Sequence, residues 1–190
     1  MTVEIIEEAP EALPEYEKVF IAFCVESYFR VELCPSESGG FRLIEEKAAP
    51  SIKDYDENEK DKPSQWPRRW DLSSWGLFSA FAGQSRVGGA AVAWNTSGMD
   101  MLEDDDRLAC LWDLRVHPDY RGKGVGHQLF ARALEWARAR GCHRLVVETQ
   151  NINVPACRFY ARQGCELGAV SRDAYEKSLN EIQLLWYRNL

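Results

Sequence analysis

The chain has 190 residues, of which 45% are hydrophobic and 28% are charged, and its net charge is −7. This length and composition are typical of one globular domain with a buried core, and they exclude disordered, collagen-like and coiled-coil proteins. The acidic balance disfavours general nucleic-acid binding, because such binding requires an excess of lysine and arginine.

The sequence carries no signal for a membrane, a secretory pathway or a metal. No uninterrupted apolar run approaches the ~18 residues that a membrane span needs, and the acidic start Met1–Glu8 differs from a secretory signal. The six cysteines form no CxxC pair and no zinc spacing. We therefore expect free thiols, no metal site and a reducing, cytoplasmic location.

The first 75 residues give weak structural signals. The segment 15–23 fits a strand or a helix, and its periodicity does not distinguish them. Residues 36–75 are polar and rich in serine, glycine and proline, so we expect an irregular, partly helical section. It ends in Trp66, Trp70 and Trp75, which could form walls for a cationic acceptor or could simply pack in the core.

The middle of the chain shows clearer patterns. The apolar runs 77–82 and 89–94 flank a glycine-containing turn, which predicts a β-hairpin. The acidic stretch 100–106 is expected to be a solvated connection. Residues 108–116 form a third predicted strand, which Pro118 ends because proline cannot donate to a ladder.

The last third alternates helix and strand signals. An apolar stripe predicts an amphipathic helix over 125–140, ended by Gly141. The run 143–149 predicts a buried strand. Two more elements are predicted. Asn153 caps a helix that carries Pro155 in its first turn and ends at Gly164, and a strand follows over 181–188. This order predicts an α/β fold, with a mixed sheet flanked by helices.

The strongest local feature is the segment Arg121-Gly122-Lys123-Gly124-Val125-Gly126, which joins a strand to the amphipathic helix. Its glycines expose backbone amides at the positive end of the helix, where phosphate binds well. Between Arg115 and Arg144 there are seven basic and two acidic residues, a net +5, so the rest of the chain carries −12. The pattern predicts an anion site; the alternative is a glycine-rich turn that only caps the helix.

This segment is similar to the R/Q-x-x-G-x-G/A pyrophosphate loop of the GNAT superfamily of N-acetyltransferases. Residues 113–118 resemble the bulged central strand of that family, and 148–153 with 158–164 resemble its next strand and helix. The resemblance implies a mixed, splayed central sheet flanked by helices. It also implies one domain over 1–190, with a variable acceptor-side part (1–75) and an acetyl-CoA-binding part (77–190).

A narrower resemblance is to the streptothricin acetyltransferases. The stretches 147–160 and 181–187 are much like theirs. Cys165 stands where that family usually has phenylalanine, and Gly168-Ala169 replaces a Gly-Gly pair. These departures fall near the acceptor side.

The resemblance implies acetyl-CoA as co-substrate. The loop amides would hold the pyrophosphate, the backbone of the bulged strand would pair with the pantetheine arm, and Asn153 would either reach that arm or only cap its helix. The implied cofactor-binding residues are Leu114, Arg115, Val116, Arg121, Gly122, Lys123, Gly124, Val125, Gly126, His127 and Asn153.

Acetyl transfer to an amine needs a base and benefits from an acid. A lysine-like amine arrives protonated, and the leaving thiolate resembles that of cysteine. By resemblance, Tyr160 is the acid and Glu148 is the first candidate for the base, with Asp113 second. Either carboxylate could instead bind the amine as a counter-ion or pair with an arginine. Cys157 as an acyl carrier is disfavoured, because no base lies next to it in the sequence.

The expected function is acetyl transfer from acetyl-CoA to a primary amine of a small cationic acceptor, such as a streptothricin-like antibiotic, with a role in antibiotic resistance. The alternatives are acetylation of a protein N-terminus or lysine, and a non-catalytic acyl-CoA-binding module. We expect a small-molecule partner, no nucleic acid and no membrane, with a homodimer as one possible assembly.

Overall fold

The computed structural model describes residues 2–34, 40–103, 105–176, 179 and 181–190. Ser36, Ser38 and Gly39 of the polar section and Asp104 of the acidic connection lie outside the described residues. The chain forms two compact units. The first unit comprises residues 1–22, 54–146 and 189–190, and the second comprises 23–53 and 147–188.

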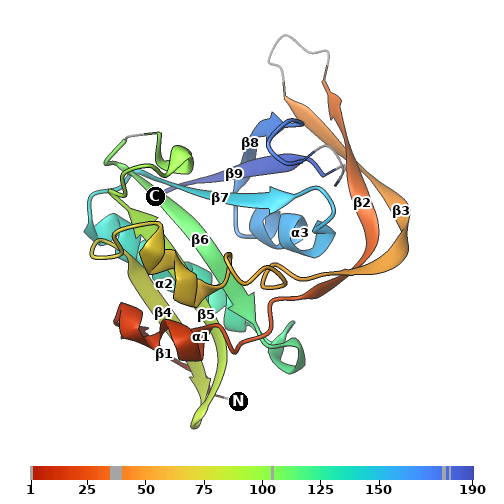
Figure 1. The fold of residues 1–190 in the computed structure, drawn as a ribbon. Coiled ribbons are helices and arrows are strands. Elements are labelled where there is room, and N and C mark those ends of the chain that lie inside the picture. The colour runs from red at the N-terminus through yellow and green to blue at the C-terminus, as the bar shows by residue number, and fades with distance from the viewer. Residues whose placement is uncertain (1, 35–39, 104, 177–178, 180) are drawn as a thin grey trace. The chain divides into compact units, whose positions relative to one another are not determined.

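Four strands of the first unit pair in the order β1-β4-β5-β6, each antiparallel to its neighbour: β1 (Glu4–Glu8), β4 (Gly76–Ala82), β5 (Ser85–Trp94) and β6 (Leu108–Val116) (Figure 1). The predicted hairpin is confirmed as β4 and β5, and Gly83 supplies the left-handed φ of +61° at their turn. The predicted strand 108–116 is confirmed with the same bounds. β1 was not expected from the sequence.

Helices cover both faces of these strands. α2 (Val125–Ala139) packs on one face, while α1 (Leu13–Tyr16) packs on the other (Figure 1). Two glycines of β5 permit this close approach. A Cβ on Gly88 would lie 3.1 Å from Leu129 of α2, and one on Gly89 would lie 2.2 Å from the Tyr16 ring. The predicted helix is confirmed, and Gly141 follows it with a φ of +79°.

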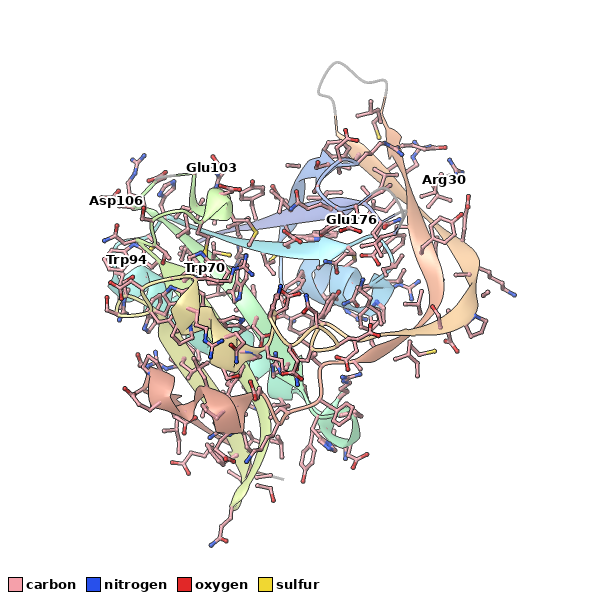
Figure 2. The ribbon with its side chains drawn as sticks, viewed as in Figure 1. Arg30, Trp70, Trp94, Glu103, Asp106 and Glu176 are labelled. Atoms are coloured by element: carbon pink, nitrogen blue, oxygen red, sulfur yellow. The ribbon has the colours of Figure 1, made fainter. Side chains whose placement is uncertain are left out.

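The connections of the first unit contain short 3-10 turns: η1 (Pro10–Ala12), η2 (Pro63–Arg68), η3 (Asp100–Leu102) and η4 (Pro118–Tyr120). Glu103 and Asp106 of the acidic connection are exposed, as predicted (Figure 2). The ambiguous segment 15–23 contains the end of α1, a turn and the first residue of a strand, so neither a continuous helix nor a continuous strand forms there.

The second unit contains a two-stranded antiparallel sheet of β2 (Phe23–Leu33) and β3 (Phe41–Lys53). The prediction of an irregular section is therefore wrong for residues 41–53, although it is right about helical structure at η2. Pro50 misled it. In the register, Val25 pairs with Ser51 and Ser27 pairs with Lys47, so Pro50 lies in a bulge where no ladder amide is needed.

The other elements of the second unit are β7 (Arg144–Gln150), of which the last four residues belong here, α3 (Val154–Arg162), β8 (Glu166–Ser171) and β9 (Gln183–Asn189). The strands follow the order β7-β9-β8. The Asn153 side chain accepts a hydrogen bond from the Ala156 amide at 3.1 Å, which confirms the predicted cap of α3. β8 was not expected. Its Gly168 forms a bulge where a Cβ would lie 2.5 Å from the Tyr187 ring.

The observed class is α/β, with mostly antiparallel strands and flanking helices, as the sequence predicted. No helix among the described residues is long and apolar enough to cross a membrane. All six cysteines are thiols in the structure.

Candidate active site

The loop between β6 and α2 has the geometry of an anion cradle. Gly122 and Gly124 adopt left-handed φ values of +71° and +86°, and a Cβ on either would meet no atom within 4 Å. The helical ladder of α2 starts with the Gln128 amide, which donates to the Gly124 carbonyl at 3.1 Å. The amides of Val125 and Gly126 precede that bond and lie at the positive end of the helix. The loop is therefore open and rich in donors.

Arg121 has a different environment from the rest of the loop. Its Nε donates to the Val116 carbonyl at 2.9 Å, and its Nη2 donates to the carbonyls of Ala22 at 2.9 Å and Phe20 at 3.4 Å. Burial lowers the pKa of Arg121. Its guanidinium thus ties the loop to residues 20–22 through backbone carbonyls. Lys123 is exposed, with its Nζ 5.5 Å from the centre of the Tyr120 ring.

β6 carries a bulge, as the resemblance to the GNAT central strand implied, and it falls at Trp112, directly before the segment 113–118. Asp113 pairs with Ala91 and Leu111 pairs with Val92, so Trp112 between them has no counterpart on β5. Beyond the bulge, Leu114, Arg115 and Val116 pair with Ala90, Gly89 and Gly88 and run directly into the loop. The predicted cofactor-binding strand segment and the predicted pyrophosphate loop are therefore continuous in the first unit.

Asp113 takes part in a buried charge network on the α1 side of β6. Arg115 Nε and Nη2 donate to the two oxygens of Asp113 at 2.9 and 2.8 Å, and Tyr16 Oη donates to Oδ1 at 2.5 Å. Arg115 also donates to Asp56 at 2.7 Å and is only 2% exposed. Of the alternatives for Asp113, pairing with an arginine is the one that this geometry favours.

The pKa shifts of this network follow from burial and charge. Burial alone would lower the pKa of Arg115, but the charge of Asp113 and its hydrogen bonds hold that pKa above its usual range. Burial is the main cause that raises the pKa of Tyr16 and that of Asp56. Tyr16 therefore remains a neutral donor to Asp113.

Glu148 lies near the end of β7, in the second unit. The next residue, Thr149, places its Oγ1 3.3 Å from the Cys157 Sγ of α3, so alternation along the strand directs Glu148 to the face opposite α3. One carboxylate oxygen accepts a hydrogen bond from Tyr175 Oη, and the other accepts one from Gln183 Nε2 at 2.6 Å. Both donors are neutral groups.

α3 carries the predicted acid on its buried face. Val154, Cys157 and Tyr160 are its buried residues, with Tyr160 6% exposed and its ring 5.1 Å from that of Phe159. Burial raises the pKa of Cys157 to about 11, so this thiol remains protonated near neutral pH and is a poor nucleophile. This geometry agrees with the expectation that Cys157 is not an acyl carrier.

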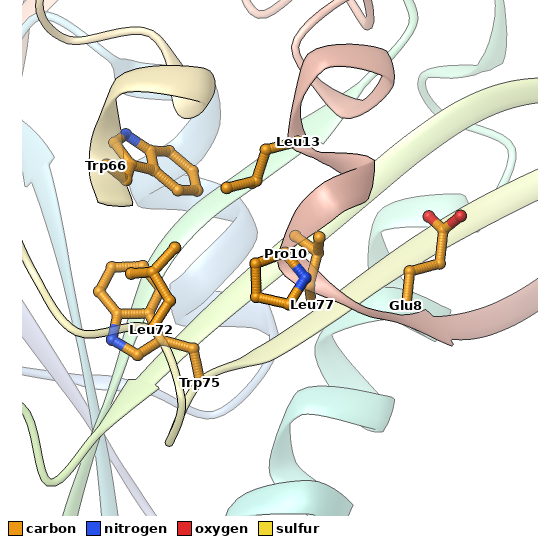
Figure 3. Close-up of a pocket in the computed structure, with 7 residues that line it drawn as sticks. All are labelled: Glu8, Pro10, Leu13, Trp66, Leu72, Trp75 and Leu77. Carbon is orange, nitrogen blue, oxygen red and sulfur yellow. The ribbon is translucent and has the colours of Figure 1, made fainter. Parts of the chain in front are cut away.

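The tryptophan-rich piece is part of the core of the first unit. Trp66 is 3% exposed and belongs to a buried cluster with Leu13 and Tyr16, against which Trp70 packs. The Trp70 ring lies 4.8 Å from that of Trp112, edge to face. A pocket beside the cluster has mainly apolar walls: Pro10, Leu13, Trp66, Leu72, Trp75 and Leu77, with Glu8 at its edge (Figure 3). Core packing is thus the better of the two sequence interpretations for Trp66.

Sequence reasoning missed the residues that hold the two carboxylates. Tyr16 and Asp56 are separated from Asp113 and Arg115 by long stretches of chain, and no motif marks them. Tyr175 and Gln183 likewise meet Glu148 only in the fold. The one local signal was Gln183, a polar residue directly before the apolar run Leu184–Tyr187.

Comparison with known proteins places the chain in a family. A model of the acetyltransferase (GNAT) family matches residues 42–165. The chain belongs to this family and is an acetyl-CoA-dependent N-acetyltransferase. It is similar to streptothricin acetyltransferase A of Bacillus subtilis, with 30% identity over 154 residues, which cover 80% of this chain and 81% of that protein. It is also similar to an Escherichia coli streptothricin acetyltransferase, with 31% identity over 182 residues, 94% and 91% of the two chains.

Solved structures agree at the level of the fold. The crystal structure of a nourseothricin acetyltransferase superposes with a TM-score of 0.75 at 25% identity and covers 100% of this chain and 99% of that chain. A Bacillus anthracis protein assigned as a streptothricin acetyltransferase, solved in complex with acetyl coenzyme A, has a TM-score of 0.80 at 23% identity, with full coverage of both chains. The GNAT fold that the sequence resemblance implied is confirmed.

Proposed function

We propose that this enzyme acetylates a primary amine of a small cationic acceptor of the streptothricin type. The observation that carries the mechanism is the setting of Glu148, a strand carboxylate bound by two neutral donors, Tyr175 and Gln183. The acceptor class rests on the relatives, since both bacterial streptothricin acetyltransferases align with most of this chain. A role in antibiotic resistance follows from the same proposal.

The β6–α2 loop is proposed to hold the pyrophosphate of acetyl-CoA. The residues fit an anion, because Gly122 and Gly124 leave open the space that a Cβ would occupy and the helix presents its first-turn amides there. The exposed Lys123 adds charge. The proposed contacts come from the amides of Gly122, Lys123, Gly124, Val125, Gly126 and His127, from the backbone of Leu114, Arg115 and Val116, and from Asn153. Arg121 supports this site by holding the loop, since its guanidinium binds carbonyls.

Acetyl-CoA supplies the acetyl group as a thioester, and its thiol is the leaving group. Glu148 is proposed to take the proton from the acceptor ammonium, which frees the nitrogen lone pair for attack on the acetyl carbonyl. Tyr160 is proposed to hold a proton on Oη for the departing sulfur. Since Glu148 and α3 lie on opposite faces of β7, the base serves one side of the reacting centre and the acid serves the other.

Glu148 is preferred to Asp113 as the base because of what each carboxylate binds. Asp113 has both oxygens on the buried cation of Arg115, and a proton on Asp113 would break that charge pair. Glu148 can accept a proton without losing an ionic partner among its described contacts. Asp113 is therefore proposed to fix the structure of β6.

Domain organisation, assembly and location remain predictions. We propose that residues 1–190 are one GNAT domain in which 77–190 supply most of the acetyl-CoA contacts and 1–75 contribute to acceptor selection. The small-molecule acceptor, the cytoplasmic location and a homodimer belong to the same set of proposals. The thiol state of the six cysteines agrees with a reducing compartment.

A thiol-release assay tests the proposal. The protein is incubated with acetyl-CoA and, in separate reactions, with streptothricin, a peptide with a free N-terminal alanine, or a lysine peptide whose N-terminus is blocked. Acetylation of streptothricin well above both peptides is the expected result. Preference for a peptide would point to the protein-acetylating alternative, and acetyl-CoA binding without thiol release from any amine would point to a non-catalytic module.

A further inference from the structure

Two neutral side chains, Tyr175 and Gln183, donate to Glu148, and a third, Gln150, donates to Tyr175. Tyr175, from the connection between β8 and β9, donates its hydroxyl proton to one carboxylate oxygen. Gln183 of β9 donates to the other at 2.6 Å. Gln150 of β7 donates its Nε2 proton to Tyr175 Oη at 3.0 Å. The glutamate is therefore held from both sides by a short hydrogen-bonded chain.

We propose that Tyr175 is a positioning residue for the reaction: its hydroxyl orients the Glu148 carboxylate and stabilises its ionised, proton-accepting state. This inference rests on the proposed role of Glu148 as the base. A tyrosine hydroxyl has one proton to donate and can also accept. Because Gln150 donates to the oxygen of Tyr175, the hydroxyl proton is directed to Glu148.

The two described donors leave further acceptor positions on the Glu148 carboxylate. An ionised carboxylate has about four acceptor positions on its two oxygens, and the two described donors use one on each oxygen. An ammonium group can therefore approach a carboxylate that is already oriented. A hydrogen bond to the charged form of a carboxylate favours that form, so the Tyr175 hydroxyl supports the ionised Glu148 that a base requires.

The backbone holds these donors in place. Asn151, which is 3% exposed, follows β7 and binds Ile182 twice: its amide donates to the Ile182 carbonyl at 2.9 Å, and its Oδ1 accepts from the Ile182 amide at 2.8 Å. Gln183 is the next residue. This double contact fixes the start of β9 against the end of β7, where Glu148 lies.

Two charged residues close to the network in the chain, Glu181 and Arg172, have described partners of their own. Glu181 pairs with Lys53 at 2.7 Å, and Arg172 donates to the Val31 carbonyl at 3.1 Å. From α3, the Cys157 thiol faces Thr149 on the other side of β7, and burial raises its pKa to about 11. The Glu148→Gln profile, in which the carboxylate itself is removed, identifies the acidic limb that belongs to Glu148.

The test compares pH–rate profiles of Tyr175→Phe, Glu148→Gln and Tyr28→Phe, with acetyl-CoA and streptothricin as substrates. Tyr28→Phe is the matched control, because it removes another tyrosine–glutamate hydrogen bond in the same unit, the 2.5 Å contact between Tyr28 and Glu46. We expect Tyr175→Phe to lose about tenfold in turnover on the acidic limb of the profile and less at high pH. The acidic limb of the Tyr28→Phe profile should stay at the same pH as in the wild type.

The outcomes distinguish the positioning role of Tyr175 from the role of Glu148 as the base. If Glu148→Gln is inactive at neutral pH while Tyr175→Phe has the wild-type profile, the role of Tyr175 is refuted and Glu148 remains the base. If Glu148→Gln keeps wild-type activity, the proposed function of Glu148 fails first. Gln183→Met removes the donor to the second carboxylate oxygen of Glu148 and is a second test of the network. A change of the Gln183→Met profile in the same direction as that of Tyr175→Phe supports the network. Wild-type profiles in both variants overturn it, even if one variant is poorly stable.

Discussion

Asp113 in the first unit and Glu148 in the second are carboxylates on β-strands, yet their surroundings differ. Asp113 binds the guanidinium of Arg115 through both oxygens and is almost fully buried. Glu148 binds a hydroxyl and an amide. A carboxylate locked to a buried cation contributes to stability and gains little by taking a proton, whereas one oriented by neutral donors can accept a proton and release it. The partners of each carboxylate, rather than its residue type, separate a structural role from a chemical one.

The largest expected effect falls on Tyr160, the proposed acid. Tyr160→Phe keeps the ring and removes only the hydroxyl, so turnover should fall ~10²–10⁴-fold, the usual contribution of a general acid. Steady-state kinetics measure this, and calorimetry should show acetyl-CoA affinity close to that of the wild type. Near-normal turnover would reduce Tyr160 to packing on α3.

The next prediction concerns Asp113, whose replacement should lower the stability of the fold. Asp113→Asn leaves Arg115 buried with a weaker partner, so the free energy of unfolding should fall by roughly 3 kcal/mol. Urea unfolding gives the value. Asp61→Asn is a suitable control, because it alters a half-exposed pair with Arg69 at 3.6 Å and should cost less than about 1 kcal/mol. Equal costs for the two variants would mean that the Asp113–Arg115 pair does not stabilise the fold.

A smaller effect is expected at the anion cradle. Gly124→Val forces a branched residue into a φ of +86°, which costs about 1–2 kcal/mol. The loop should relax away from its present shape, and the acetyl-CoA dissociation constant should rise about tenfold. Gly83→Val is a matched control, with a φ of +61° and equally open space in the β4–β5 turn. If calorimetry finds the same affinity in both variants, the loop does not bind the cofactor.

The sequence predicted those parts of the fold that have local signals. The hairpin, β6, α2 and the Asn153 cap follow from apolar period, glycine and proline positions and capping chemistry within a few residues. β1 and β8 were missed because each is a short strand that depends on a distant partner or on a bulge. β3 was missed because its proline suggested a break, and pairing with β2 accommodates that proline in a bulge.

The candidate site also contains residues with local signals and residues that depend on distant partners. The glycines of the loop could be selected from their motif, and the two carboxylates from the resemblance to the GNAT family. Their partners could not, because Tyr175 and Gln183 lie 27 and 35 residues beyond Glu148, and Asp56 lies 59 residues before Arg115. No local pattern specifies such pairs. The choice between two candidate bases therefore had to wait for the contacts that each carboxylate makes.

The most direct test of the central claim is a pair of pH–rate profiles, for Glu148→Gln and Asp113→Asn, each normalised to folded enzyme. We predict that Glu148→Gln loses ~10²–10⁴-fold in turnover at neutral pH. Part of this turnover should return near the pKa of a lysine-like amine, about 10.4, because the acceptor no longer needs a base there. Asp113→Asn should keep the wild-type profile. Loss of neutral-pH turnover in Asp113→Asn, with Glu148→Gln unaffected, would reverse the assignment.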